Sequence, residues 1–187
     1  MALWISPYLA LKNLTFPFPD FRPQQRALAE TVYRNSVRQQ TLLLEAPTGL
    51  GKTLGTLFPA LMAMPTARQD RLFYLTSRNT ARQLAVDAVH LLREKQPGPL
   101  PLRTLELVAK DHACEHPDKA CHGDACPLAK GFFDRLPAAR KDAANHSGAL
   151  TQMVLADIAR QHGICPYFLA QEMARWCDVV VADVNRM

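Results

Sequence analysis

The sequence predicts an α/β fold in which a parallel sheet carries helices on both faces. Short apolar runs alternate with helical patterns up to about residue 98: residues 41–46 and 71–77 are predicted strands, and 52–64 and 79–95 are predicted helices. A glycine-rich turn joins the first strand directly to the first helix. Because strands that are connected through helices pair in parallel with right-handed crossovers, this order predicts a parallel sheet.

The predicted helices of this first part have an apolar side. In residues 79–95 one face holds Ala85, Val89 and Leu92, and beside it lie Leu84, Ala88 and Leu91. An earlier helix is expected from Pro23, a favourable first helical residue, to about Val37.

The second part of the chain predicts two strands and a long irregular loop. Residues 102–109 and 179–182 have the composition of buried strands. Residues 111–130 are rich in Cys, His, Pro and Gly and follow neither the helix nor the strand period. This composition indicates a loop that needs a cross-link to hold its structure.

Two further helices are predicted between that loop and the last strand. One is expected at residues 147–161, with Ser147 as its cap and Gly163 ending it. The other is expected at residues 166–176, where a proline stands at the first helical position.

Composition and charge restrict the class of protein only weakly. The net charge of +5 and the pI near 9.1 permit a polyanionic partner. No apolar run approaches the roughly 18 residues of a membrane span, and Pro7, Pro17 and Pro19 interrupt the stretch where a signal peptide needs an apolar core. A cytoplasmic protein without membrane contact is therefore expected.

The most specific motif is the turn from Ala46 to Thr53, with the sequence APTGLGKT. Gly49 and Gly51 let the backbone curl so that its N–H groups face a phosphate, at a helix N-terminus that favours anions. Lys52 supplies a positive charge to the β- and γ-phosphates, and the Thr53 hydroxyl is a ligand for Mg²⁺. We therefore predict an ATP and Mg²⁺ site with Lys52 and Thr53 as catalytic residues. Its predicted contacts are Ala46, Pro47, Thr48, Gly49, Leu50, Gly51, Lys52 and Thr53.

Cysteines provide the second strong signal. Cys114 and Cys121 are separated by six residues, Cys121 and Cys126 by four, and Cys126 and Cys165 by 38. Four thiolates can hold either tetrahedral zinc or an iron–sulfur cluster. Three histidines could replace a cysteine ligand: His112, His116 and His122. Spacing alone leaves zinc, iron–sulfur and unpaired buried cysteines as alternatives.

Two stretches around the turn resemble motifs of superfamily 2 helicases of the DinG/XPD-like kind. Residues 45–53 resemble motif I, and the upstream sequence FRPQQ at residues 21–25 is similar to the Arg-x-x-Gln element that precedes it. The resemblance implies that Gln25 lies against adenine and that Arg22 also belongs to the nucleotide site. Without the resemblance, both would be interpreted as the polar first turn of a solvated helix.

A further stretch resembles the family's nucleic-acid contacts. The sequence YLTSRNT at residues 74–80 is similar to motif Ia, which in the family contacts the backbone of single-stranded DNA. The segment that leads into the first cysteine also resembles the family. The implied nucleic-acid contacts are Thr76, Ser77, Arg78 and Lys110. From spacing alone, the first three could instead cap the following helix.

The sequence GICPYFL at residues 163–169, together with the strand that follows, closely resembles the family segment that carries the last cysteine of a [4Fe–4S] cluster. The resemblance implies that Cys114, Cys121, Cys126 and Cys165 hold such a cluster. Cys177 is expected to be a small buried apolar residue, with ligation as its alternative role.

By this resemblance the parent protein would be an ATP-dependent DNA helicase of DNA repair or replication, moving 5′ to 3′ on single-stranded or forked DNA. Residues 1–110 would be the P-loop NTPase (RecA-like) part of motor domain 1, and 111–166 a small, mainly helical iron–sulfur insertion. Residues 167–187 would return into the motor domain. A monomer is expected.

The sequence departs from the family pattern at its last residues. Asn185 is followed by Arg186 where the family has a tyrosine, and no Walker B Asp-Glu-Ala-His follows in this sequence. The Walker B acid completes the Mg²⁺ site and a second motor domain supplies arginines, so the chain alone is expected not to hydrolyse ATP appreciably. Two alternatives stay open: a non-catalytic truncated or regulatory product that binds nucleotide or nucleic acid, and a zinc-stapled nucleic-acid-binding module.

Overall fold

The computed structural model describes residues 7–184, and the chain divides into two compact units. The first unit comprises Met1–Tyr74 and Gln83–Leu102, and the second comprises Leu75–Arg82 and Arg103–Met187. The chain therefore passes between the units within β1 (Leu72–Thr76), near the start of α4 (Asn79–Glu94) and after residue 102.

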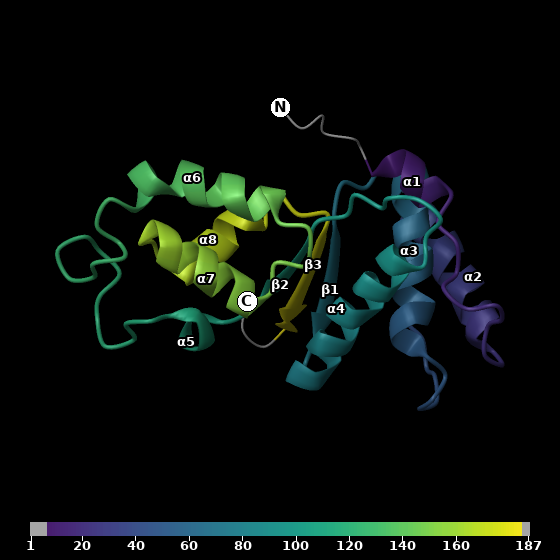
Figure 1. Ribbon diagram of the computed structural model, residues 1–187. Helices are drawn as coiled ribbons and strands as arrows, with labels where there is room; N and C mark the ends of the chain where they lie inside the picture. The colour runs from purple at the N-terminus through teal and green to yellow at the C-terminus, as the bar shows by residue number, and fades with distance from the viewer. Residues whose placement is uncertain (1–6, 185–187) are drawn as a thin grey trace. The chain divides into compact units, whose positions relative to one another are not determined.

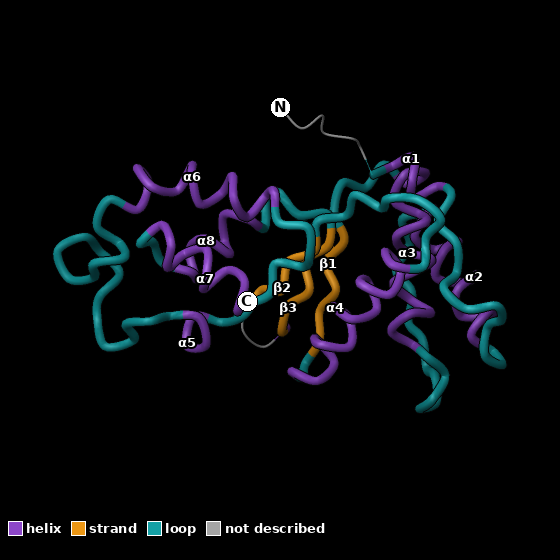
Figure 2. The backbone as a smooth tube through the Cα atoms, in the orientation of Figure 1, coloured by secondary structure: helices purple, strands orange, loops and turns teal. Residues whose placement is uncertain are grey.

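The first unit is built around α3 (Lys52–Ala67), against which α1 (Tyr8–Lys12) and α2 (Gln25–Val37) pack (Figures 1 and 2). Apolar side chains cover most of α3, and Leu57, Leu61 and Met64 are almost completely buried. A helix that is apolar around most of its circumference needs partners on several sides. α3 is therefore the core element of this unit.

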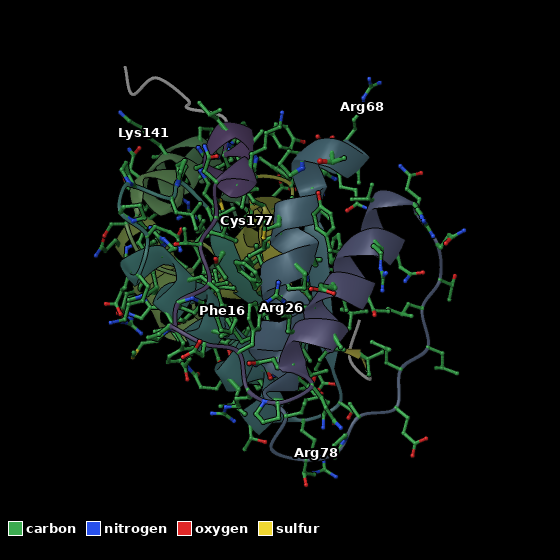
Figure 3. The ribbon with its side chains drawn as sticks, turned by 90° about the vertical axis from the view of Figure 1, so that its right-hand side faces the viewer. Phe16, Arg26, Arg68, Arg78, Lys141 and Cys177 are labelled. Carbon is green, nitrogen blue, oxygen red and sulfur yellow. The ribbon has the colours of Figure 1, made fainter. Side chains whose placement is uncertain are left out.

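Aromatic rings fix the segment before α2 to α3. Phe16 stacks on Phe21 with ring centroids 3.9 Å apart, and it meets Phe58 of α3 edge-to-face at 5.3 Å. Such pairs contribute about 0.5–1.5 kcal/mol beyond their buried area. Phe16 faces the viewer in Figure 3. These contacts guide the chain along α3 and bring the start of α2 to the turn that precedes α3.

The second unit contains most of a small sheet with the strand order β1-β3-β2. β2 (Thr104–Leu107) and β3 (Val179–Asp183) run parallel, with Thr104 opposite Val179. All five residues of β3 are buried. This burial is typical of a central parallel strand that is covered on both faces.

Three helices of the second unit pack against one another beside this sheet (Figures 1 and 2). Their shared core also receives Leu105 of β2 and Val180 of β3. A long irregular segment connects the short α5 to α6 and carries three of the cysteines. The bounds of these helices are α5 (Lys110–Ala113), α6 (Phe132–Asn145), α7 (Gln152–His162) and α8 (Pro166–Met173).

The first predicted strand does not form. Residues 41–46 have no regular secondary structure, and Leu43 and Leu44 are 96% and 43% exposed. The apolar run has the composition of a strand, but a strand also needs a neighbour that accepts its backbone hydrogen bonds. No strand within residues 7–184 pairs with this segment. The expectation of a buried strand there is therefore wrong.

Two helix predictions need correction. The helix expected from residue 147 begins at Gln152, and its cap is Thr151, whose hydroxyl accepts a hydrogen bond from the Val154 N–H. The predicted end is confirmed, since Gly163 closes α7 in the left-handed conformation, with φ of 62°. α6 was not predicted, and it contains a proline at residue 137.

The α/β class and the parallel pairing are confirmed, and most other predicted elements form within a few residues of their expected bounds. No helix in the described part of the chain is both long enough and apolar enough to cross a membrane. Asn185 and Arg186, where the sequence departs from the family pattern, lie outside the described residues. The division at residues 110 and 166 stays a prediction.

Candidate functional site

The predicted phosphate-binding turn leads directly into α3. Gly51 precedes the helix with φ of 79°, and Gly49 has φ of 84°, both in the left-handed region that residues with a side chain rarely adopt. The first helical residues are Lys52 and Thr53. Because the first N–H groups of a helix have no partner inside it, they can bind an anion that lies in the turn.

The side chain of Lys52 lies across this turn. Its ammonium donates hydrogen bonds to the carbonyl oxygens of Ala46, at 3.1 Å, and Pro47, at 2.7 Å. Lys52 is exposed, so a ligand can reach it. A phosphate would replace two neutral acceptors by charged oxygens, which form stronger hydrogen bonds with an ammonium. The lysine is thus held at the turn with partners that an anionic ligand can displace.

Arg22 and Gln25 hold the turn from the side of α2. The Arg22 guanidinium donates to the Gly49 carbonyl at 2.9 Å, and the Gln25 amide Nε2 donates to the Gly51 carbonyl at 3.0 Å. Gln25 is only 3% exposed, and its Oε1 accepts the Arg22 N–H at 3.0 Å. The structure therefore brings both predicted residues to the turn, where Gln25 uses its amide on backbone groups. Its implied contact with adenine stays a prediction.

A cavity of about 950 Å³ lies beside Arg22, between α2 and α3. Its lining residues include Phe21, Tyr33, Phe58 and Arg26, the last of which is labelled in Figure 3. Flat aromatic walls with nearby guanidinium groups suit a planar heterocycle. Arg22 is the residue that both lines this cavity and touches the turn.

The predicted motif Ia residues differ in their exposure. Thr76 is buried, and its hydroxyl donates to the Arg78 carbonyl at 3.1 Å, which fixes the turn between β1 and α4. Ser77 and Arg78 are exposed, and so is Lys110 at the start of α5. Arg78 is labelled at the lower edge of the view in Figure 3. The structure thus makes three of these four side chains available to a ligand.

A buried carboxylate that the sequence analysis missed lies in the middle of β2. Glu106 is 8% exposed, and its Oε1 accepts a hydrogen bond from Arg82 Nε at 2.8 Å. Its Oε2 accepts the backbone N–H of Gln152, the first residue of α7, at 3.1 Å. The signal in the sequence was a single acid inside an apolar run. Glu106 connects the start of α4 to the helical part of the second unit.

The cysteines differ in burial. Cys126 and Cys165 are buried, Cys114 is half-buried and Cys121 is exposed. Cys177 is 2% exposed and belongs to the apolar core of the second unit, as expected for a small buried residue. Four of the cysteines therefore stand on or near the irregular segment and the start of α8, and the fifth stands in the core.

Charge interactions connect Cys165 with Cys114 and Cys126, and connect Lys110 with Cys121 and Cys114. Burial raises the pKa of the Cys165 thiol, the N–H groups of Phe168 and Tyr167 act against this, and the charges of Cys114 and Cys126 raise it further. The pKa of Lys110 is raised, first by a hydrogen bond with Cys121 and the charge of that thiol, and then by Cys114. No group of three or more His, Cys, Asp or Glu side chains within residues 7–184 is arranged to hold a single metal ion.

Comparisons with known proteins agree with the motifs. The family model DEAD_2 matches residues 102–187. A probable ATP-dependent helicase of Methanocaldococcus jannaschii is 41% identical over 61 residues, which are 33% of this chain and 9% of that protein. The general transcription and DNA repair factor IIH helicase subunit XPD of Arabidopsis thaliana is 24% identical over 196 residues, covering 89% of this chain and 26% of that protein.

The matches cover both halves of the chain. The stretch that the family model matches contains all five cysteines together with β2 and β3. The match to the Arabidopsis protein extends over most of the sequence. The chain spans about a quarter or less of the length of these two relatives. Over the matched residues, this chain is similar to the N-terminal region of DinG/XPD-like helicases.

Proposed function

We propose that this chain binds ATP and single-stranded DNA as the P-loop part of the first motor domain of an ATP-dependent DNA helicase. The observation that carries the proposal is the turn at residues 46–53, with the Lys52 ammonium across it and the first N–H groups of α3 behind it. Movement from 5′ to 3′ and work in DNA repair or replication are part of the same proposal, through the family.

In this proposal the triphosphate lies in the turn and displaces the Ala46 and Pro47 carbonyls from Lys52. The ammonium then neutralises the β- and γ-phosphates, and the Thr53 hydroxyl is a ligand for Mg²⁺. Arg22 stands between the turn and the aromatic cavity, so the base would lie in that cavity. Gln25 would hold the Gly51 carbonyl and thereby the shape of the turn.

Hydrolysis needs more than these groups. An acid must complete the Mg²⁺ site, and a cation must stabilise the phosphoryl group during transfer. The turn supplies the lysine and the hydroxyl, and none of its own residues from Ala46 to Thr53 is acidic. We therefore propose that they bind and orient ATP, and that turnover depends on groups elsewhere in the helicase.

Nucleic acid would bind to exposed side chains that follow β1 and β2 in the sequence. Ser77 and Arg78 follow β1 and Lys110 follows β2, and all three side chains are exposed. Hydroxyl and cationic side chains bind phosphate oxygens without regard to base sequence. Thr76 would act indirectly, by fixing the turn that presents Arg78.

We propose that Cys114, Cys121, Cys126 and Cys165 hold a [4Fe–4S] cluster, as the family resemblance implies. Support comes from the charges of Cys114 and Cys126 that act on Cys165, and from two backbone N–H groups that face Cys165, since N–H groups stabilise thiolates. Such a cluster would cross-link a segment that has no apolar core of its own.

Nucleotide titration tests the proposal. Calorimetry with Mg²⁺ and a slowly hydrolysed ATP analogue should show one site per chain, and Lys52→Ala should weaken binding about tenfold or more, because hydrogen bonds to charged groups contribute about 1.5–3 kcal/mol. Lys95→Ala, which removes another exposed lysine of the same unit, is the matched control. Equal affinity of the Lys52→Ala chain would overturn the nucleotide site.

Anaerobic purification tests the cluster. The protein should be brown and contain about four irons and four sulfides per chain. Cys165→Ser should lose this iron, whereas Cys177→Ala should retain it, since Cys177 lies in the apolar core. A colourless protein with one zinc would instead support a zinc-stapled module.

The rate of ATP hydrolysis distinguishes a chain that only binds ATP from a complete helicase. The chain alone should bind ATP and hydrolyse it far more slowly than whole helicases do. A DNA-stimulated rate comparable with whole helicases, lost in Lys52→Ala, would contradict the proposal that turnover needs further groups. A non-catalytic regulatory product would bind both ligands but would gain no activity when combined with a second motor domain.

A further inference from the structure

A basic and aromatic surface lies at the amino-terminal ends of β2 and β3. Arg103 immediately precedes β2, Trp176 lies just before β3, and Arg140 of α6 reaches the Trp176 ring. We call these three residues the Trp176 surface. β2 and β3 are parallel, so this surface lies at one end of the pair, whereas Lys110 follows the other end. The proposed DNA contacts therefore do not include it.

Contacts from two elements hold Trp176 in place. The Arg140 guanidinium lies over the indole, 5.0 Å from the ring centroid, within the range of a cation–π interaction. Arg103 Nη1 donates to the Trp176 carbonyl at 3.2 Å, and the Arg103 N–H donates to the Asp178 carboxylate at 2.8 Å. Figure 1 shows the end of α6 beside the connection from α8 to β3.

Trp176 nevertheless remains 46% exposed. Burial of a tryptophan is favourable, so packing alone would bring this ring further into the core. An indole that is fixed from one side and open on the other is already arranged for a ligand, which then has little side-chain entropy to overcome. The exposed ring is the second observation, beside the charge, that points to a planar partner.

The charge around this ring is positive. Arg103 and Arg140 contact Trp176 directly, and the neighbouring Arg175 is exposed. The acid closest in sequence is Asp178, whose carboxylate accepts the Arg103 backbone N–H. On α6, an Asp142 carboxylate oxygen lies 2.7 Å from His162 Nε2.

We propose that the Trp176 surface is a second nucleic-acid-binding site, specific for single strands. One unpaired base would stack on the exposed part of the indole, and the guanidinium groups of Arg103 and Arg140 would bind the adjoining phosphates. A duplex fits less well, because its bases already stack on one another. An acidic peptide would use the charges but not the ring. The inference rests on the proposed function for the nature of the ligand, but it concerns different residues.

Tryptophan fluorescence reports on this site directly. The chain has two tryptophans, so Trp4→Phe leaves Trp176 as the single emitter. Titration of this variant with oligodeoxythymidylate should quench the emission in a saturable manner, because stacked bases quench indole. The anisotropy of a labelled oligonucleotide measures total binding in the same samples. Trp176→Ala should weaken total binding about five- to tenfold, and Trp176→Phe less.

Substitutions at two neighbouring residues of α6 test the contribution of the Arg140 charge to binding. Arg140→Gln should weaken binding and reduce the salt dependence by about one phosphate contact. Lys141→Gln is the matched control, because Lys141 stands next to Arg140 on α6 and points outward in Figure 3. This control should bind within about twofold of the unmodified chain. Circular dichroism confirms that each variant folds.

The outcomes separate this inference from the proposed function. A rise in anisotropy without quenching of Trp176, and with unchanged binding by Arg140→Gln, would overturn the second site and leave the proposed DNA binding intact. Absence of any oligonucleotide binding would overturn both. Equal quenching by polyglutamate would show that the surface responds to charge alone, which also contradicts the proposal.

Discussion

Replacing Gly51 by alanine tests how α2 shapes the phosphate-binding turn. A Cβ at this position would lie 2.4 Å from Nε2 and 3.3 Å from Cδ of Gln25, far inside normal contact distance. Gly49 offers a matched control, because its φ of 84° is similar and a Cβ there meets nothing within 4 Å. Both substitutions place an alanine in the left-handed region, but only the alanine at position 51 collides with the Gln25 side chain.

The structure allows the difference to be estimated. An alanine in the left-handed region costs about 1–2 kcal/mol at either glycine. At Gly51 the Gln25 amide must also leave, which breaks its bonds with the Gly51 carbonyl and the Arg22 N–H. At about 0.5–1.5 kcal/mol for each bond, the additional cost is about 1–3 kcal/mol. Gly51→Ala should therefore destabilise the chain by about 2–5 kcal/mol and Gly49→Ala by about 1–2 kcal/mol.

Urea denaturation measures both costs. In a Gln25→Ala background the additional cost of Gly51→Ala should disappear, because the colliding side chain is absent. Equal free energies of unfolding for Gly49→Ala and Gly51→Ala, or an additional cost that persists without Gln25, would refute this account of the turn.

Three further predictions concern the framework around the sites. Glu106→Ala should lower the free energy of unfolding by about 3–5 kcal/mol, because the largely covered Arg82 guanidinium then keeps only its hydrogen bond to Asn79 and loses its carboxylate partner. The double change Arg82→Met with Glu106→Leu should be nearly neutral. Equal losses for the two variants in urea denaturation would contradict this account of the pair. Thr151→Ala should cost about 1 kcal/mol through loss of the cap of α7, and an unchanged melting temperature would argue against this cap. Leu43→Ser should change stability by less than about 0.5 kcal/mol because the side chain is exposed, and a loss several times larger would indicate that residues 41–46 are buried after all.

Local patterns predicted the helices well because amphipathic spacing is a property of the segment itself. α4 has Ala85, Val89 and Leu92 on its buried face, as the sequence indicated. The same signal exists in α6, where residues 132, 136, 139 and 143 are buried at helical spacing, although Pro137 interrupts the pattern. Residues 41–46 could not be judged in this way, since a strand depends on a partner that local composition does not reveal.

The candidate site shows the same limit. The residue types of the turn, with its two glycines before Lys52, were sufficient to predict where an anion would bind. Local pattern alone did not predict that Arg22 and Gln25 hold the turn, because their contacts with it join positions 27 and 26 residues apart; only the family resemblance assigned both residues to the nucleotide site. Glu106 was missed for a similar reason, since its partners Arg82 and Gln152 come from distant segments.

Residue-resolved nuclear magnetic resonance on the labelled chain tests the central claim most directly. On addition of Mg²⁺ and ATP, the backbone amide signals of Gly49, Gly51, Lys52 and Thr53 should shift together and saturate, because these N–H groups gain phosphate acceptors. Signals of Lys95 and Lys141 should stay unchanged. Unshifted amides in the turn at saturating nucleotide, or shifts confined to other parts of the chain, would contradict the account.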